Sequence, residues 1–202
     1  MVKTMDLKQQ KTPKSRARKY KEGDIQYLNE EELAALFRSI DTPRDMAIFE
    51  VAFHRGLRAS EVGLLKVSGL RLAARRLYIE RLKNGNPGEY LLTDREVRAL
   101  RKWMAVRGTA PGPLFLSRQR GKISRSRLDQ LVKHYGARAG LPESKRHFHC
   151  LRHSAGTLLG EKAPAEEVQD HLGHRDIRST MKYLKVRNKR RDDLGTRMRN
   201  EW

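Results

Sequence analysis

The spacing of the apolar residues restricts most strongly how this chain can fold. From Leu28 onward they recur at intervals of three and four, as in Leu33, Leu36, Phe37 and Ile40, and this spacing lines one face of an α-helix. The same spacing returns in the second half of the chain, after a change of period near the middle. The pattern predicts a mainly α protein with a small antiparallel β-sheet.

Several helix boundaries are marked by capping residues. Asn29 and Glu32 have the spacing of an N-cap and its N3 partner. Pro43 suits the first turn of a second helix, and Ser60 and Ser124 are expected to cap two later helices. Further helices are expected over residues 61–65, 97–108, 125–140, 149–161, 164–172 and 177–184.

The change of period indicates a β-hairpin. Residues 77–79 and 90–92 are extended in character, and the turn formers Asn-Gly-Asn-Pro-Gly occupy residues 84–88. Lys83 is therefore expected at the edge of the turn. Residues 113–116 form another short extended segment.

The charge of the chain points to a polyanionic partner. The 202 residues suit one ordinary domain, and 44 Lys and Arg residues against 24 Asp and Glu give a formal charge of +20. Such an excess destabilises a compact fold by self-repulsion, which a nucleic acid would relieve. On composition alone, a solubilising surface and a ribosome-associated protein remain open. No segment approaches the roughly 20 apolar residues of a membrane span.

The cysteine content and the N-terminal residues favour the cytoplasm. Cys150 is the single cysteine, so an intramolecular disulfide cannot form. No apolar stretch follows the basic first residues as it would in a signal peptide. Residues 1–27 are expected to be a flexible basic arm, since they carry too little apolar surface to offset ordering.

Four short segments carry chemically useful side chains. Taken singly, each has an ordinary interpretation: a surface ion pair, a solvated turn lysine, a polar helix face, a packed tyrosine. Their order within one domain is what makes them informative. They are Gly56-Leu57-Arg58-Ala59-Ser60-Glu61, Lys83, His149-Cys150-Leu151-Arg152-His153, and Leu172-Gly173-His174 with Tyr183 nine residues after the histidine.

In this order the segments resemble the tyrosine recombinase, or phage-integrase-like, family. The matching motifs are G-L-R-A-S-E at 56–61, H-C-L-R-H-S at 149–154 and L-G-H-R-D-I-R-S-T-M-K-Y at 172–183. The small size, with F-H-R-G-L-R-A-S-E at 53–61, R-L-Y-I-E-R-L-K at 76–83 and L-F-L-S-R at 114–118, looks most like the short recombinases that invert fimbrial promoters. The resemblance implies a tyrosine recombinase catalytic-domain fold over residues 28–185.

The resemblance also implies a mechanism without metal, ATP or another cofactor. Site-specific recombination of DNA would proceed through a 3′-phosphotyrosyl intermediate, with inversion, excision or integration as its outcome. Forked guanidinium groups match the charge on a phosphate, and a positioned cation can protonate a leaving oxygen. The expected roles are Tyr183 as nucleophile, Arg58 and Arg152 on the phosphate, Lys83 as general acid, His149 as proton acceptor or phosphate ligand, His174 as a hydrogen-bonding group, and Glu61 as support for Arg58.

The expected partner is double-stranded DNA. The resemblance implies a homo-tetramer on two synapsed sites. Because no N-terminal clamp domain is expected before residue 28, site recognition is expected to depend either on accessory DNA-bending proteins and synapsis or on the catalytic domain's own helix and hairpin contacts. Residues 186–202 are interpreted either as a basic tail or as a helix exchanged between protomers. Candidate DNA-contacting residues are Arg118, Arg120, Lys122, Arg125 and Arg127.

Three other interpretations compete with a recombinase. A zinc site at His147, His149 and His153 has suitable spacing, but the adjacent basic residues oppose cation binding, so no metal is expected. A binding-only architectural protein requires the charge without the catalytic pattern. A type IB topoisomerase uses similar chemistry and would relax supercoils without partner sites. Cys150 is interpreted as core packing.

Overall fold

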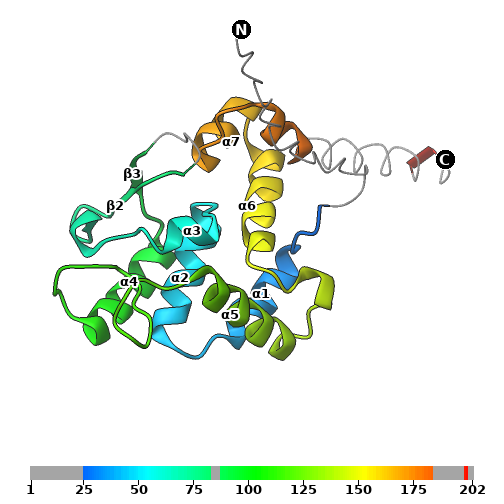
Figure 1. Ribbon diagram of the computed structural model, residues 1–202. Helices are drawn as coiled ribbons and strands as arrows, with labels where there is room; N and C mark the ends of the chain where they lie inside the picture. The colour runs from blue at the N-terminus through cyan, green and yellow to red at the C-terminus, as the bar shows by residue number, and fades with distance from the viewer. Residues whose placement is uncertain (1–24, 83–86, 184–197, 200–202) are drawn as a thin grey trace, which may run out of the picture.

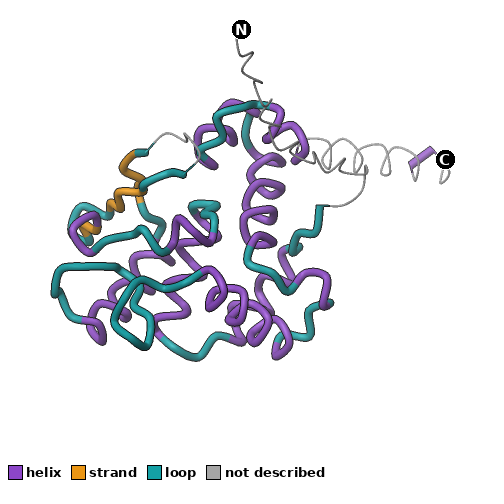
Figure 2. The backbone as a smooth tube through the Cα atoms, in the orientation of Figure 1, coloured by secondary structure: helices purple, strands orange, loops and turns teal. Residues whose placement is uncertain are grey.

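The structure is a computed structural model that describes residues 25–82, 87–183 and 198–199. These residues are mainly helical and include three short antiparallel strands (Figures 1 and 2), so the predicted fold class is confirmed. Lys83, most of the predicted basic arm and nearly all of residues 186–202 lie outside the described residues.

The elements follow one another in the predicted order, with the later helices at nearly the predicted bounds. The described elements are α1 (Glu30–Ser39), α2 (Pro43–His54), α3 (Ala59–Val62), η1 (Val67–Gly69), β1 (Leu70–Arg71), β2 (Arg76–Ile79), β3 (Gly88–Leu91), α4 (Asp94–Arg107), α5 (Arg125–Arg138), η2 (Glu143–Lys145), α6 (His149–Lys162), α7 (Ala165–Leu172) and a final helical segment at 178–183.

The predicted N-caps of α1 and α5 are confirmed. The Asn29 N–H donates to Glu32 Oε2 at 2.9 Å, and the Glu32 N–H donates to Asn29 Oδ1 at 2.8 Å. The Arg127 N–H donates to Ser124 Oγ at 3.1 Å. These contacts, reciprocal in α1 only, satisfy backbone donors that the first helical turn leaves without partners.

The predicted cap of α3 is wrong. α3 begins at Ala59, so Arg58 occupies the cap position and Ser60 lies inside the helix. The Arg58 N–H donates to Glu61 Oε2 at 2.9 Å. The carboxylate of Glu61 thus pairs with the backbone N–H of the cap residue, and Arg58 is placed at the helix N-terminus.

The core is built around α2. Seven of its residues are buried, and it packs against α4 on one side and α6 on another. Phe49 lies at the centre, edge-on to Tyr135 of α5 at 5.8 Å and to Phe148 at 6.5 Å between ring centroids. A helix buried on most of its surface explains why its apolar residues do not follow a single stripe.

The sheet has the order β1-β2-β3, antiparallel throughout. In β2, Leu77 and Ile79 are buried while Tyr78 is exposed, which is the alternation of a half-buried strand. The predicted hairpin is β2–β3. The two-residue strand β1 was not expected, because it is too short to show any alternation.

Helix α6 stands beside α2 and α3, and α7 packs across its C-terminal part (Figure 1). This arrangement brings the end of α2, the start of α3 and the end of α7 toward α6. None of the helices in the described part of the chain is long and apolar enough to cross a membrane.

We predict that Phe49→Ala lowers the free energy of unfolding by about 3–5 kcal/mol, because it removes a fully buried ring and leaves a cavity. Urea denaturation measures this loss. Val106→Ala, at a side chain that is 68% exposed, is the control and is expected to change stability by less than about 0.5 kcal/mol. Equal losses in the two variants would contradict the packing described.

Candidate active site

Glu61 connects the first predicted phosphate ligand to its surroundings. Its side chain is fully buried, and Oε1 accepts a hydrogen bond from Arg58 Nη1 at 2.6 Å. Burial opposes ionisation of Glu61, but the Arg58 N–H and the charges of Arg81 and Arg58 prevail and lower its pKa. Arg58 keeps 20% of its side chain exposed, so its guanidinium is held on one side and open on another.

Arg152 lies on α6 and is 1% exposed. Its Nη1 donates to the Gly56 carbonyl at 2.5 Å and its Nη2 to the Leu172 carbonyl at 2.8 Å. Glu61 Oε2 lies 3.9 Å from Nη1. Burial lowers the pKa of Arg152 to about 10, which still leaves it charged at neutral pH.

His149 begins α6, one turn before His153. Their rings lie 4.6 Å apart, and the His153 ring lies 5.9 Å from that of Tyr183, both in edge-to-face geometry. Burial, followed by the charges of Arg152 and Lys182, lowers the pKa of His149 to about 4. His149 is therefore neutral at pH 7 and can accept a proton.

His174 follows α7, and its ring also lies against that of Tyr183. The two rings are stacked, with centroids 6.2 Å apart and an interplanar angle of 11°. His174 Nδ1 lies 2.9 Å from the Thr180 hydroxyl. Burial and the charges of Arg152 and Arg58 lower the pKa of His174 to about 3.

Tyr183 is 1% exposed and packs with Val168 and Leu172 of α7. Its ring also lies against Gly156 of α6, where a Cβ atom would approach Tyr183 Cε2 to 2.6 Å. Glycine at this position thus makes room for the phenol. The structure brings Arg58, His149, Arg152, His174 and Tyr183 into one region, whereas Lys83 is outside the described residues.

The sequence interpretation missed three side chains of this region. Lys182 Nζ lies 4.9 Å from the Tyr183 ring centroid, and burial with the charges of Arg152 and Arg58 lowers the pKa of Lys182. Thr180 is fully buried and orients His174. His153 contacts Tyr183. The sequence could have pointed to these three residues, because they lie inside the motifs at 149–154 and 172–183, close to residues that were given catalytic roles.

Comparison with known proteins agrees with this geometry. Residues 26–190 match the phage integrase family. The chain belongs to this family. Its members, the tyrosine recombinases, are enzymes that cleave and rejoin DNA at specific sites.

Individual family members show the same likeness. The chain is 34% identical over 166 residues to the type 1 fimbriae regulatory protein FimB of Escherichia coli (strain K12), which covers 78% of this chain and 82% of FimB. The crystal structure of XerA recombinase superposes with a TM-score of 0.74 at 25% identity, covering 86% of this chain and 65% of XerA. The structure of XerH site-specific recombinase bound to its difH substrate superposes with a TM-score of 0.69 at 25% identity, covering 79% of this chain and 50% of XerH.

The predicted DNA-contacting residues of this tyrosine recombinase lie in the loop before α5 and in its first turn. Arg118, Arg120 and Lys122 are exposed in a loop closed by a bridge between Leu116 and Lys122. This loop approaches α3, since a Cβ at Gly63 would lie 2.9 Å from the carbonyl of Ile123. Arg125 is exposed and Arg127 is partly exposed, both in the first turn of α5.

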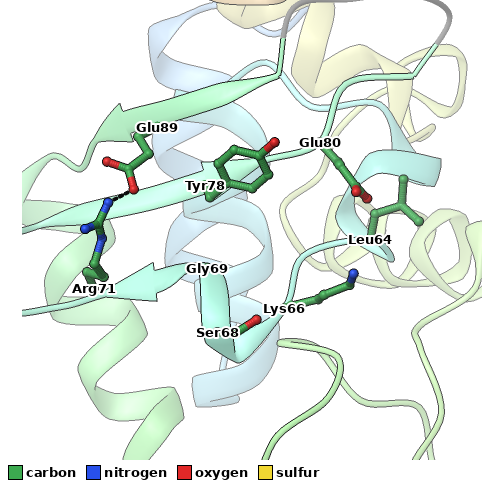
Figure 3. Close-up of a pocket in the computed structure, with 8 residues that line it drawn as sticks. All are labelled: Leu64, Lys66, Ser68, Gly69, Arg71, Tyr78, Glu80 and Glu89. Atoms are coloured by element: carbon green, nitrogen blue, oxygen red, sulfur yellow. Dashed lines mark ion pairs between the residues drawn. The ribbon is translucent and has the colours of Figure 1, made fainter.

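A separate cavity of about 460 Å³ lies on the outer face of the sheet (Figure 3). Glu80 and Tyr78 project into it, and an ion pair between Arg71 and Glu89 borders it. None of the proposed site residues lines this cavity, and its glutamates would repel phosphate. Among the described residues, no three His, Cys, Asp or Glu side chains form a cluster able to hold a metal ion.

The buried histidines predict a specific acid sensitivity. Burial and the charges of His149 and Lys182 lower the pKa of His153 from its usual 6.5 to about 3. The unfolded chain therefore takes up this proton first, so the stabilisation present above pH 6.5 is lost as the pH falls toward 3. His153→Gln is expected to flatten the loss of stability between pH 6 and 4 by up to about 1.4 kcal/mol per pH unit.

Urea unfolding at several pH values measures this slope. His134→Gln is the matched control, because His134 is exposed on α5. An unchanged slope in His153→Gln would contradict the prediction.

Gly156→Ala is expected to expel the Tyr183 ring, because the new methyl group would overlap it. Nitration of Tyr183 by tetranitromethane, located by peptide mass spectrometry, should then become several-fold faster. Gly121→Ala is the control, since its nearest neighbour would be 3.8 Å away. If nitration of Tyr183 is the same in both variants, the contact does not hold the ring.

Proposed function

We propose that this protein recombines specific DNA sites by cutting and resealing strands through Tyr183, with inversion, excision or integration as the outcome. The observation that carries the proposal is the convergence of two arginines and two neutral histidines around one tyrosine. Arg58 and Arg152 share the Glu61 carboxylate, and His174 stacks on Tyr183. Membership of the tyrosine recombinase family supports it independently.

In the proposed cleavage step, the Tyr183 oxygen attacks the scissile phosphorus and the bond from phosphorus to the 5′-oxygen breaks. The products are a 3′-phosphotyrosyl linkage and a free 5′-hydroxyl. Arg58 and Arg152 neutralise the non-bridging oxygens, where negative charge builds up. Attack by another 5′-hydroxyl reverses the step, so the linkage conserves the bond energy and rejoining needs no ATP.

Two protons move in this step. A phenol is a weak nucleophile at its usual pKa of about 10, and His149 takes its proton because burial keeps that imidazole neutral. Lys83 supplies a proton to the departing 5′-oxygen, an assignment that depends on the sequence motif. His174 donates or accepts a hydrogen bond at the phosphate.

The phenol must move before it can react. A side chain that is 1% exposed cannot reach a phosphate, so we propose that DNA binding displaces the segment at 178–183 from α7 and Gly156. Phosphate entering between Arg58 and Arg152 would also raise the pKa values of His149 and His174 by opposing the neighbouring positive charges.

The proposed partner is double-stranded DNA in the cytoplasm. Arg118, Arg120, Lys122, Arg125 and Arg127 are the proposed contacts, and the basic arm adds phosphate contacts that weaken steeply with salt. We further propose a homo-tetramer on two synapsed sites, coupled through residues 186–202, and accessory DNA-bending proteins that assist site recognition.

The decisive experiment uses a nicked suicide substrate that contains the inverted repeats flanking the gene. The wild-type protein is expected to accumulate a covalent DNA adduct, and peptide mapping should place it on Tyr183. Tyr183→Phe should abolish the adduct while leaving DNA affinity within about twofold, because the substitution removes one hydroxyl group.

Tyr78→Phe is the matched control, since Tyr78 is 44% exposed on the sheet and away from the site. Adducts that survive Tyr183→Phe would refute the assignment of the nucleophile. Relaxation of supercoiled plasmid without paired sites would indicate a topoisomerase, and binding without any strand breakage would indicate an architectural protein.

A further inference from the structure

We infer that Arg81 is a positioning residue for strand cleavage, which holds Arg152 and His174 in register with Arg58. The inference rests on the proposed function, because it concerns the geometry of the same site. Arg81 lies just after β2, two residues before Lys83 in the R-L-Y-I-E-R-L-K motif at 76–83, and no role was assigned to it from the sequence.

The Arg81 guanidinium ties together elements that are distant in sequence. Its side chain is fully buried. Nη1 donates to Glu61 Oε2 at 3.3 Å, and Nη2 donates to the carbonyls of Arg55 at 3.0 Å and His171 at 2.7 Å. The end of α2, the helix α3 and the end of α7 therefore meet at one cation.

Arg152 makes a parallel set of contacts one residue further along. It binds the carbonyls of Gly56 and Leu172, where Arg81 binds those of Arg55 and His171. Glu61 Oε2 faces both arginines. The two guanidinium groups thus bridge the same pair of helix ends, where unpaired carbonyls favour cations.

Arg81 also supports the turn that leads to His174. A Cβ at Gly173 would lie 3.0 Å from Arg81 Cδ, and Gly173 has a φ of +60°. The Arg81 side chain therefore forms the surface on which this left-handed turn rests, one residue before His174. On its other side, Arg81 Nε contacts the Tyr90 hydroxyl at 3.3 Å and its Cζ lies 5.0 Å from the Tyr90 ring centroid.

Lysine cannot reproduce these contacts. A guanidinium presents five donors in a fixed plane, whereas an ammonium is a point charge on a flexible stem. Arg81→Lys keeps the charge but cannot reach Glu61, Arg55 and His171 together. Arg81→Lys is expected to weaken stabilisation of the phosphate charge. The ends of α2 and α7 lose the hydrogen bonds from Arg81, and these same helix ends set the position of Arg152.

The test compares two suicide substrates in single-turnover reactions. One carries the natural scissile phosphodiester, and the other carries a methylphosphonate, in which a methyl group replaces a charged non-bridging oxygen. Arg81→Lys is expected to slow adduct formation about 100-fold on the phosphodiester. On the methylphosphonate the loss should be at least tenfold smaller, since less charge must be neutralised.

Arg55→Lys is the matched control. Counted over the whole residue, Arg55 and Arg81 are both 7% exposed, but the Arg55 side chain binds Glu96 and the Leu91 carbonyl. A purely structural defect lowers the rate of adduct formation by the same factor on both substrates. This pattern is expected for Arg55→Lys. Tyr90→Phe removes one Arg81 contact with little risk to folding and should show a weaker form of the Arg81→Lys pattern.

Each outcome decides the inference. A wild-type rate in Arg81→Lys, or equal losses on the two substrates for both Arg81→Lys and Tyr90→Phe, overturns it. These results leave the proposed function intact as long as wild-type protein forms the Tyr183 adduct. Absence of that adduct in wild-type protein overturns the proposed function itself, and the inference with it.

Discussion

The site depends on one buried carboxylate. Glu61 is fully buried, and Arg58, Arg81 and the backbone of Leu82 donate hydrogen bonds to it. A buried charge is tolerated only when it is paired, and here the pairing cations come from different elements. Glu61 therefore holds α3 and the end of β2 together near α6, and its negative charge lets positively charged groups gather where DNA phosphate is proposed to bind.

The C-terminal ends of two helices supply further negative charge to this site. The carbonyls of residues 55, 56, 171 and 172 accept from two arginines, so the C-termini of α2 and α7 contribute partial negative charge beside these two cations. Lys182 and Arg58 add further positive charge, and the histidines respond by remaining neutral. The same electrostatic environment that is proposed to attract phosphate thus keeps the His149 imidazole, the proposed proton acceptor, neutral.

The local features of the fold could be predicted from the sequence. Asn29 and Ser124 mark helix starts because capping is decided within four residues. The prediction that Ser60 caps α3 was wrong, because the helix begins one residue earlier and the Glu61 side chain bonds to the Arg58 backbone N–H. Extending the alternation of Leu77 and Ile79 by two residues predicts that Arg81 is buried, but the contacts of its guanidinium depend on α2 and α7 and could not be predicted from this pattern. The burial of Tyr183 could not be predicted either, because it depends on Gly156, which lies 27 residues earlier in the chain.

The close packing of Tyr183 on Gly156 has a consequence for fidelity. An enzyme whose reactive group begins in the protein interior adds the same free-energy cost to cleavage at every DNA sequence. Only a sequence that makes enough favourable contacts to offset the exposure of the ring reaches the chemical step at a useful rate. In the proposed mechanism, Gly156, by leaving room for the Tyr183 ring, thereby limits cleavage at DNA sequences that cannot offset its exposure.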